Sequence, residues 1–249
     1  MSGAHAADSA APDGVPQPAR LRAMLVIILG LTLSVLDISI VNLALPGIAR
    51  ELQADASSAI WIVNAYQLAA LVLLLPLAAL GDRLGYRRVY LVGMAVFTVA
   101  SVGAMLATSL EALIVARVLQ GAGSAGIMSV NGAMVRLIYP RALLGRGVAL
   151  NSLVVAGATM AGPSVAAAIL SVGNWPWLFA LNLPLGIFTL WLGRRALPFN
   201  PAKPGGSGQP IALLDVALNI AMFTLIFLGV ERLGVRMEGS AAAASQAGG

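Results

Sequence analysis

Seven long apolar segments dominate this chain of 249 residues, and each is close to 20 residues long. They cover residues 24–45, 60–80, 89–108, 111–135, 147–171, 177–195 and 212–233. A helix needs about 20 apolar residues to cross a bilayer. Charged residues make up only 10% of the chain, against about 25% in a typical soluble domain. We therefore predict an all-α membrane protein, a polytopic bundle of six helices followed by a seventh transmembrane helix.

The segments between and beyond the apolar runs divide the chain. We expect a disordered cytoplasmic tail over 1–23, a six-helix domain over 24–197 and a Pro/Gly-rich cytoplasmic linker over 198–211. The seventh helix then occupies 212–233, and 234–249 is a low-complexity outer tail. The first apolar run is not interpreted as a signal peptide, because Asp37 lies in its middle and six further runs follow.

The positions of the cationic residues predict the orientation. Of the 15 Lys and Arg residues, 11 lie on one side of the predicted spans. These are Arg20, Arg22, Arg83, Arg87, Arg88, Arg136, Arg141, Arg146, Arg194, Arg195 and Lys203. Arg50, Arg232 and Arg236 lie on the other side, and Arg117 lies inside a span. The positive-inside rule places the N-terminus in the cytoplasm, and seven spans then place the C-terminus outside.

The composition also excludes several kinds of site. The chain has no Cys, and its one His is His5 in the N-terminal tail, so we expect no disulfide, no metal site and no His-based catalysis. The net charge of +5 is dispersed among the loops and forms no extended basic face for nucleic acid. We therefore expect neither an enzyme nor a nucleic-acid-binding protein.

Two ionisable residues within the predicted spans are the first functional candidates, Asp37 and Arg117. A charged side chain at the centre of a bilayer costs about 2.5–3.5 kcal/mol on insertion scales, so its presence suggests a function. Arg117 shares one helical face with Gln120, Gly121, Ser124 and Asn131. One interpretation is that Asp37 binds a proton and Arg117 sets its affinity. The alternative is a buried ion pair that only holds the helices together.

Three further groups of residues are candidates. The loop GDRLGYRRV over 81–89 is rich in charge, which is consistent either with a conformational latch or with a simple topology signal. Gly162 and Pro163 can bend the fifth span, although the small residues around them are also typical of ordinary helix packing. Amide and small side chains are expected to line a cavity or to join helices by hydrogen bonds: Asn42, Asn64, Gln67, Gln120, Gly121, Ser124 and Asn151.

Several of these segments together resemble the N-terminal half of a major facilitator superfamily transporter, most closely the fourteen-span drug:proton antiporter branch. LDISIVNLALP at 36–46 is similar to the first-helix signature of that branch, and GDRLGYRRV to the superfamily's loop between helices two and three. ARVLQGAGSAG at 116–126, AGPSVAA at 161–167 and NWPWLFALNLPLGI at 174–187 resemble the motifs of helices four, five and six. The chain departs from these motifs at Ala78, Ala166 and Ala167, where the family usually has Gly.

The resemblance implies proton-coupled efflux of drugs or other amphipathic small molecules by alternating access, in a bacterial inner membrane. The proton gradient would supply the coupling ion, with no other cofactor. Asp37 and Arg117 would couple transport to protonation, Gly162 and Pro163 would form a bend, and the loop would act as a gate through Asp82, Arg83, Gly85, Arg87 and Arg88. Family members also need a second half. The alternative is therefore a truncated or split half, inactive alone or acting only as an assembly partner, with the missing C-terminal half or a second copy as its partner in the lipid bilayer.

Overall fold

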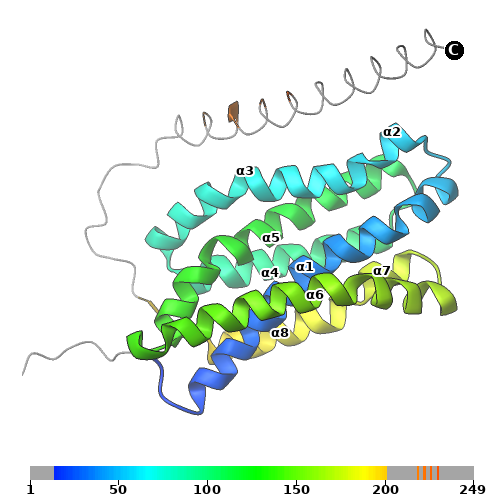
Figure 1. The fold of residues 1–249 in the computed structure, drawn as a ribbon. Coiled ribbons are helices and arrows are strands. Elements are labelled where there is room, and N and C mark those ends of the chain that lie inside the picture. Colours follow the sequence, from blue (N-terminus) through cyan, green and yellow to red (C-terminus); the bar gives the residue numbers. More distant parts are fainter. Residues whose placement is uncertain (1–13, 201–217, 219–220, 223–224, 226–228, 230–249) are drawn as a thin grey trace, which may run out of the picture.

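The computed structural model describes residues 14–200 and, beyond them, the single positions 218, 221, 222, 225 and 229. Within 14–200 the chain forms a bundle of long helices that lie roughly side by side, with successive long helices joined at alternate ends (Figure 1). The predicted seventh helix over 212–233 and the predicted tail over 234–249 lie outside the described residues apart from those five positions. They stay predictions.

Six helical segments of the described chain are long and apolar enough to cross a membrane. Three are single helices, namely α1 (Ala19–Glu51), α4 (Tyr86–Met105) and α5 (Leu110–Ile138). In the other three, a short helix precedes a long one: α2 (Ala56–Ala59) with α3 (Trp61–Leu84), the 3-10 turn η1 (Arg141–Leu143) with α6 (Leu144–Val172), and α7 (Pro176–Ala180) with α8 (Asn182–Ala196). The first six predicted spans and the all-helical fold class are therefore confirmed.

The first helix begins earlier than the apolar pattern predicts. It starts at Ala19, whereas the sequence suggested a tail up to residue 23. The residues between carry Arg20 and Arg22, and long Arg side chains can keep their charge at the membrane surface while their stems remain on the helix. Hydropathy alone therefore placed the start of this helix too late.

Local sequence signals explain where the helices begin and end. At the start of α5, the Ser109 hydroxyl accepts a hydrogen bond of 3.2 Å from the Ala112 amide, and Glu111 lies in the first turn, as expected for a helix N-terminus. Between α3 and α4 the chain turns at Gly85, whose φ of +96° lies in the region that favours glycine. This residue joins α3 to α4 without any longer loop.

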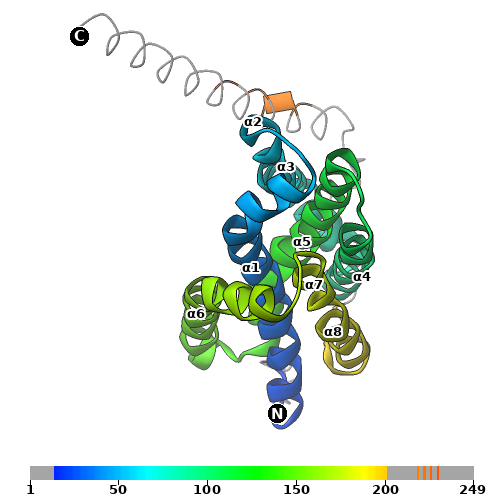
Figure 2. The same cartoon turned by 90° about the vertical axis from the view of Figure 1, so that its right-hand side faces the viewer.

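Helices α1 and α5 lie at the centre of the bundle, and α6 lies at its margin (Figure 2). In both α1 and α5, 61% of the most apolar stretch is buried, against 28% for the span that contains α3 and 17% for the span that contains α6. Helix α6 packs against α1, while α3 and α4 both pack against α5. The central pair therefore holds the two groups of outer helices together.

Two apolar clusters fill the interior of the bundle. One lies toward the end of the bundle that carries Arg83, Arg88 and Arg194, which we call the arginine-rich end. This cluster contains Tyr90 and Phe97. The other, toward the opposite end, contains Ile40, Leu113 and Phe179. A layer of buried polar side chains lies between them, and this layer includes both ionisable residues that the sequence placed within the spans.

Candidate functional site

Asp37 on α1 and Arg117 on α5 form an ion pair in the centre of the bundle. The Arg117 side chain is fully buried and the Asp37 side chain is 2% exposed. Arg117 Nη1 donates a hydrogen bond to Asp37 Oδ2. The sequence placed these residues 80 positions apart, and the packing of α1 against α5 brings them into contact.

Amide and hydroxyl side chains complete the surroundings of the ion pair. Asn182 Nδ2 on α8 donates to Asp37 Oδ1 over 2.9 Å, and Gln120 Nε2 donates to the same oxygen over 3.4 Å. Gln120 Nε2 also donates to Ser101 Oγ on α4 over 2.8 Å. We call these five residues, Asp37, Ser101, Arg117, Gln120 and Asn182, the polar cluster. It connects four helices through side chains alone.

Helix α3 contributes a backbone acceptor and an aromatic ring. Arg117 Nε donates to the carbonyl oxygen of Ile62 over 3.0 Å, and Arg117 Nη1 donates to Gln120 Oε1 over 2.8 Å. The guanidinium carbon lies 4.2 Å from the centre of the Tyr66 ring, a cation–π distance. Among the described residues, Arg117 Nη2 is buried and has no hydrogen-bond acceptor. Hydrogen bonds and a ring thus replace most of the hydration that this cation loses.

The electrostatics make the two charges depend on each other. Taking two ions out of water is expensive, and their mutual attraction compensates only while both remain charged and paired. Removing one partner of a buried pair typically costs about 3–5 kcal/mol, because the other charge is left buried alone. The polar cluster can therefore act either as a rigid lock or as a switch that responds to protonation of the carboxylate.

The other predicted amide and small residues fall into two groups. Gln120, Gly121 and Ser124 are buried within the bundle, and a Cβ on Gly121 would lie 2.3 Å from the Tyr66 carbonyl oxygen. Gly121 is thus a contact point between α5 and α3. The remaining members are less buried: Asn64 and Asn151 are half-buried, and Asn42 and Gln67 are exposed. Whether any of these residues lines a transport cavity stays a prediction.

Gly162 and Pro163 lie inside α6, which is continuous from Leu144 to Val172. Gly162 is buried against α1, where a Cβ would lie 2.2 Å from the Cβ of Ser39. Pro163 is exposed. The glycine therefore permits close contact between α6 and α1, and the predicted bend stays a prediction.

The charged loop between α3 and α4 is held by contacts on both sides of Gly85. Before it, Asp82 accepts a hydrogen bond of 2.6 Å from the Tyr86 hydroxyl. After it, Arg87 donates to the carbonyl oxygen of Arg194 at the end of α8. Arg83 is half-buried and Arg88 is exposed. The five predicted gate residues thus lie together at the arginine-rich end, far along the helices from the polar cluster.

The segment that follows α8 contacts this loop, an arrangement that no pattern in the sequence indicates. Asn200 Oδ1 accepts a hydrogen bond of 3.0 Å from the Tyr86 amide, the first amide of α4. The Phe199 ring lies 3.7 Å from the guanidinium carbon of Arg87. Asn200 therefore caps α4 from a position 114 residues away in sequence. Asn200 lies within the predicted linker, and a single Asn in a Pro/Gly-rich segment gives no indication of its partner.

Two residues of the site were not predicted from the sequence. Ser101 and Tyr66 were not candidates, because one hydroxyl or one aromatic residue within a span is common. From the sequence, Asn182 in the sixth span could either line a cavity or join helices, and in the structure it donates directly to Asp37. The described residues contain no group of three or more His, Asp or Glu side chains that could hold a metal ion.

Comparison with known proteins gives the family. Residues 27–236 match the Major Facilitator Superfamily. The chain is 51% identical over 219 residues to the uncharacterized transporter YebQ of Escherichia coli, which covers 88% of this chain and 48% of YebQ. It is 33% identical to the riboflavin transporter RibZ of Clostridioides difficile, over 85% of this chain and 46% of RibZ. It is also 33% identical to the tetracenomycin C resistance and export protein of Streptomyces glaucescens, over 82% of this chain and 38% of that protein.

Solved structures show the same fold. The human organic anion transporter MFSD10 superposes with a TM-score of 0.66 at 19% identity, over 82% of this chain and 54% of that one. The chain spans about half the length of the relatives and structures it matches. The family consists of transporters, in agreement with the expectation that the chain is not an enzyme. This multi-pass membrane chain belongs to the Major Facilitator Superfamily and corresponds to the N-terminal half of a transporter.

Proposed function

We propose that the chain is the N-terminal half of a proton-coupled exporter of small amphipathic compounds, of the fourteen-span drug:proton antiporter branch. The observation that carries this proposal is the ion pair of Asp37 and Arg117, which is buried between two apolar clusters. The pair lies on α1 and α5, and its hydrogen bonds connect these helices to α4 and α8. A buried carboxylate whose charge holds several helices together is suited to convert protonation into movement.

The coupling step follows from charge balance. When Asp37 takes up a proton, its carboxyl group becomes neutral and no longer balances the Arg117 guanidinium. The cation is then buried without a counter-ion, an arrangement that a rearrangement of α1 against α5 relieves. Protonation therefore favours one packing of the bundle and deprotonation the other, as alternating access requires.

The gate in this proposal is the loop between α3 and α4. Asp82, Arg83, Gly85, Arg87 and Arg88 would hold one conformation closed at the cytoplasmic end. The contacts of Asp82 with Tyr86 and of Arg87 with Arg194 support this role, because each ties the loop to a different helix end. Gly162 and Pro163 would supply flexibility in α6.

The substrate class is inferred from the relatives and from the exposed amides. One relative is named as a riboflavin transporter and another as a tetracenomycin C resistance and export protein, which supports a small-molecule substrate and export. The exposed amides of Asn42 and Gln67 would contact such a compound together with a second half. The excess of Arg at one end supports a cytoplasmic N-terminus in a bacterial inner membrane.

The test is transport in proteoliposomes with an imposed pH gradient, using the chain together with its C-terminal half and ethidium as a fluorescent amphipathic cation. Asp37→Asn should abolish the gradient-driven flux. Glu111→Gln is the matched control, because it makes the same change at an exposed carboxylate in the first turn of α5. Flux that survives Asp37→Asn would remove Asp37 from the coupling mechanism.

A second candidate function is that of a split half, inactive alone and acting as an assembly partner for a C-terminal half or a second copy. The low burial of α3 and α6 within this half favours it, since faces that are not packed here are available to another bundle. Cysteine cross-linking from an exposed α6 position such as Ala161 would test it in membranes. Recovery of monomer only, with and without a co-expressed second half, would contradict it.

A further inference from the structure

An apolar groove runs between α3 and α4 over the surface of α5. Its volume is about 290 Å³. Leu77 and Leu80 of α3 form one wall, Val92 and Val96 of α4 form the other, and Ala122 of α5 contributes to its floor. All of the lining residues are apolar or glycine except Arg88, which lies where α4 begins.

Small residues keep this groove open. A Cβ on Gly93 would lie 2.8 Å from the Gly123 carbonyl oxygen and 2.9 Å from the Gly126 Cα, so α4 and α5 are in backbone contact there. With glycine at both helices and Ala122 beside them, no large side chain rises from the floor. The floor of the groove is therefore the contact between α4 and α5, and the small residues at that contact make the groove deep.

The charge at the mouth of the groove is unusual for its position. Arg87 and Arg88 both lie in the first turn of α4, and that turn has no acidic residue. The N-terminus of a helix is the positive end of its dipole and favours negative groups. The Arg87 guanidinium donates to the Arg194 carbonyl oxygen and lies over the Phe199 ring. Arg88 is exposed, lines the groove and completes a positive site.

The nearby acidic residue does not cancel this charge. Asp82 accepts a hydrogen bond from the Tyr86 hydroxyl and is not among the residues that line the groove. Arg136, at the end of α5, also lies close enough to Tyr86 to influence it electrostatically. The mouth of the groove therefore has a net positive surrounding.

We propose that this groove binds one anionic phospholipid from the leaflet at the arginine-rich end, with an acyl chain between α3 and α4 and the headgroup phosphate on Arg88. The positive charge of Arg88 matches an anionic headgroup, and the apolar walls match an acyl chain. From Arg88 to Val96 the helix rises about 12 Å, close to the depth of one hydrocarbon leaflet, about 15 Å. Basic sites between helices at this depth typically bind anionic lipid headgroups.

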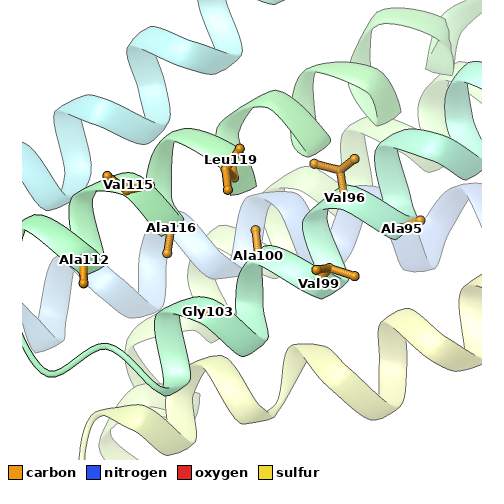
Figure 3. A pocket seen from close by; sticks show the side chains of 9 residues that line it. All are labelled: Ala95, Val96, Val99, Ala100, Gly103, Ala112, Val115, Ala116 and Leu119. Atoms are coloured by element: carbon orange, nitrogen blue, oxygen red, sulfur yellow. The ribbon is translucent and has the colours of Figure 1, made fainter.

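A second groove, on α4 and α5 only, serves as an uncharged control for the first. It lies between α4 and α5 toward the other end of the bundle, has a volume of about 510 Å³, and includes Val99 and Ala112 (Figure 3). Every residue that lines it is apolar or glycine. This groove can accept an acyl chain but has no cation for a headgroup, so it should not select between lipids by charge.

The experiment is native mass spectrometry of the purified full chain with phosphatidylglycerol and phosphatidylcholine of identical acyl chains. We expect retention of one phosphatidylglycerol about fivefold tighter than phosphatidylcholine, the selectivity that one Arg at a membrane surface provides. Arg88→Gln should remove this selectivity, and Arg88→Lys should keep it. Ala122→Leu, which fills the groove, should weaken retention of both lipids. The matched control Ala112→Leu fills the uncharged groove and should leave the selectivity unchanged.

Two outcomes would overturn the site. One is selectivity for phosphatidylglycerol that persists in Arg88→Gln, and the other is equal retention of both lipids by the unmodified chain. Circular dichroism and gel filtration report whether each variant is folded. If Ala122→Leu is not folded, Ala122→Val replaces it, and the comparison of Arg88→Gln with Arg88→Lys still decides the proposal. Transport is not measured, so this result is independent of the proposed coupling role of Asp37.

Discussion

Helices α5 and α6 have the same length, 29 residues, and both are rich in small residues, yet their surroundings are opposite. In the span of α5, 61% of the most apolar stretch is buried, and in the span of α6 only 17% is buried. Gly121, Gly123 and Gly126 of α5 lie against α3 and α4, whereas Gly157 of α6 has no neighbour within 4 Å of a Cβ position. A run of glycine and alanine therefore indicates close packing only where a partner helix is present in the same half.

The difference suggests a division of roles. Helix α5 carries Arg117 and Gln120 and makes its contacts within the chain. Helix α6 contacts α1 at Gly162 and leaves most of its surface to lipid or to another bundle. We expect substitutions in α5 to affect folding of this half directly, and substitutions in α6 to matter chiefly when a second half is present.

The largest effect should come from breaking the ion pair. Arg117→Leu leaves the Asp37 carboxylate buried without its cation and should lower the free energy of unfolding by about 3–5 kcal/mol. Thermal or denaturant unfolding in detergent measures this loss. The matched control is Arg146→Leu, an exposed arginine of α6. Equal destabilisation by the two substitutions would contradict the contrast between the helices.

A valine at the crossing of α4 and α5 should have the next largest effect. A Cβ on Gly123 would lie 2.4 Å from the Phe97 amide nitrogen, so Gly123→Val forces the helices apart at a cost of about 1–3 kcal/mol. Gly157→Val on α6 meets nothing within 4 Å and should cost nothing in this half. Size-exclusion chromatography after graded heating compares the two. A loss of folded protein in Gly157→Val equal to that in Gly123→Val would refute the difference.

Removing the cap of α4 should have a smaller effect. Asn200→Ala leaves the Tyr86 amide without its side-chain acceptor and should cost about 1 kcal/mol, the usual value of an N-cap. Hydrogen exchange at the start of α4 should accelerate in this variant. Asn174→Ala, at an exposed Asn before α7, serves as the control and should leave that exchange unchanged.

The smallest effect should be the pH response of α2. Hydrogen bonds from Ser57 and Ser58 lower the pKa of Asp55 from 3.8 to about 2. A lowered pKa means that the ionised carboxylate stabilises the folded helix above about pH 3.8, and that this contribution disappears as the pH falls toward 2. The protection factors of the amides of residues 55–60, which correct for the slower intrinsic exchange in acid, should therefore fall on acidification in the unmodified chain. Asp55→Asn should remove this pH dependence, and an unchanged pH dependence in that variant would contradict the assignment.

How much the sequence predicts differs between the fold and the site. Six spans follow from hydropathy because each needs only a local apolar run, and Asp37 and Arg117 stand out as charges within such runs. Their partners could not be predicted in the same way. Asn182 and Asp37 are 145 residues apart, and only the packing of α8 beside α1 brings an otherwise ordinary Asn to the carboxylate.

The ends of the helices likewise could not be predicted from local hydropathy alone. Hydropathy placed the start of α1 at residue 24, but Arg20 and Arg22 extend the helix beyond the apolar core. The sequence likewise gave no reason to associate Asn200 with Tyr86, since that contact depends on where α8 ends relative to α4. Local patterns predict the elements, and the contacts between distant elements decide which side chains form a site.

The cap that Asn200 provides for α4 has a mechanical consequence. Residues 197–200 continue the chain from α8, so a displacement of Asn200 and Phe199 acts on the Tyr86 amide and on Arg87 as well as on α8. Those two residues lie directly after Gly85, the single residue that joins α3 to α4. A pull on Asn200 would therefore reach the charged loop and the start of α4 directly, in parallel with the covalent connection to α8.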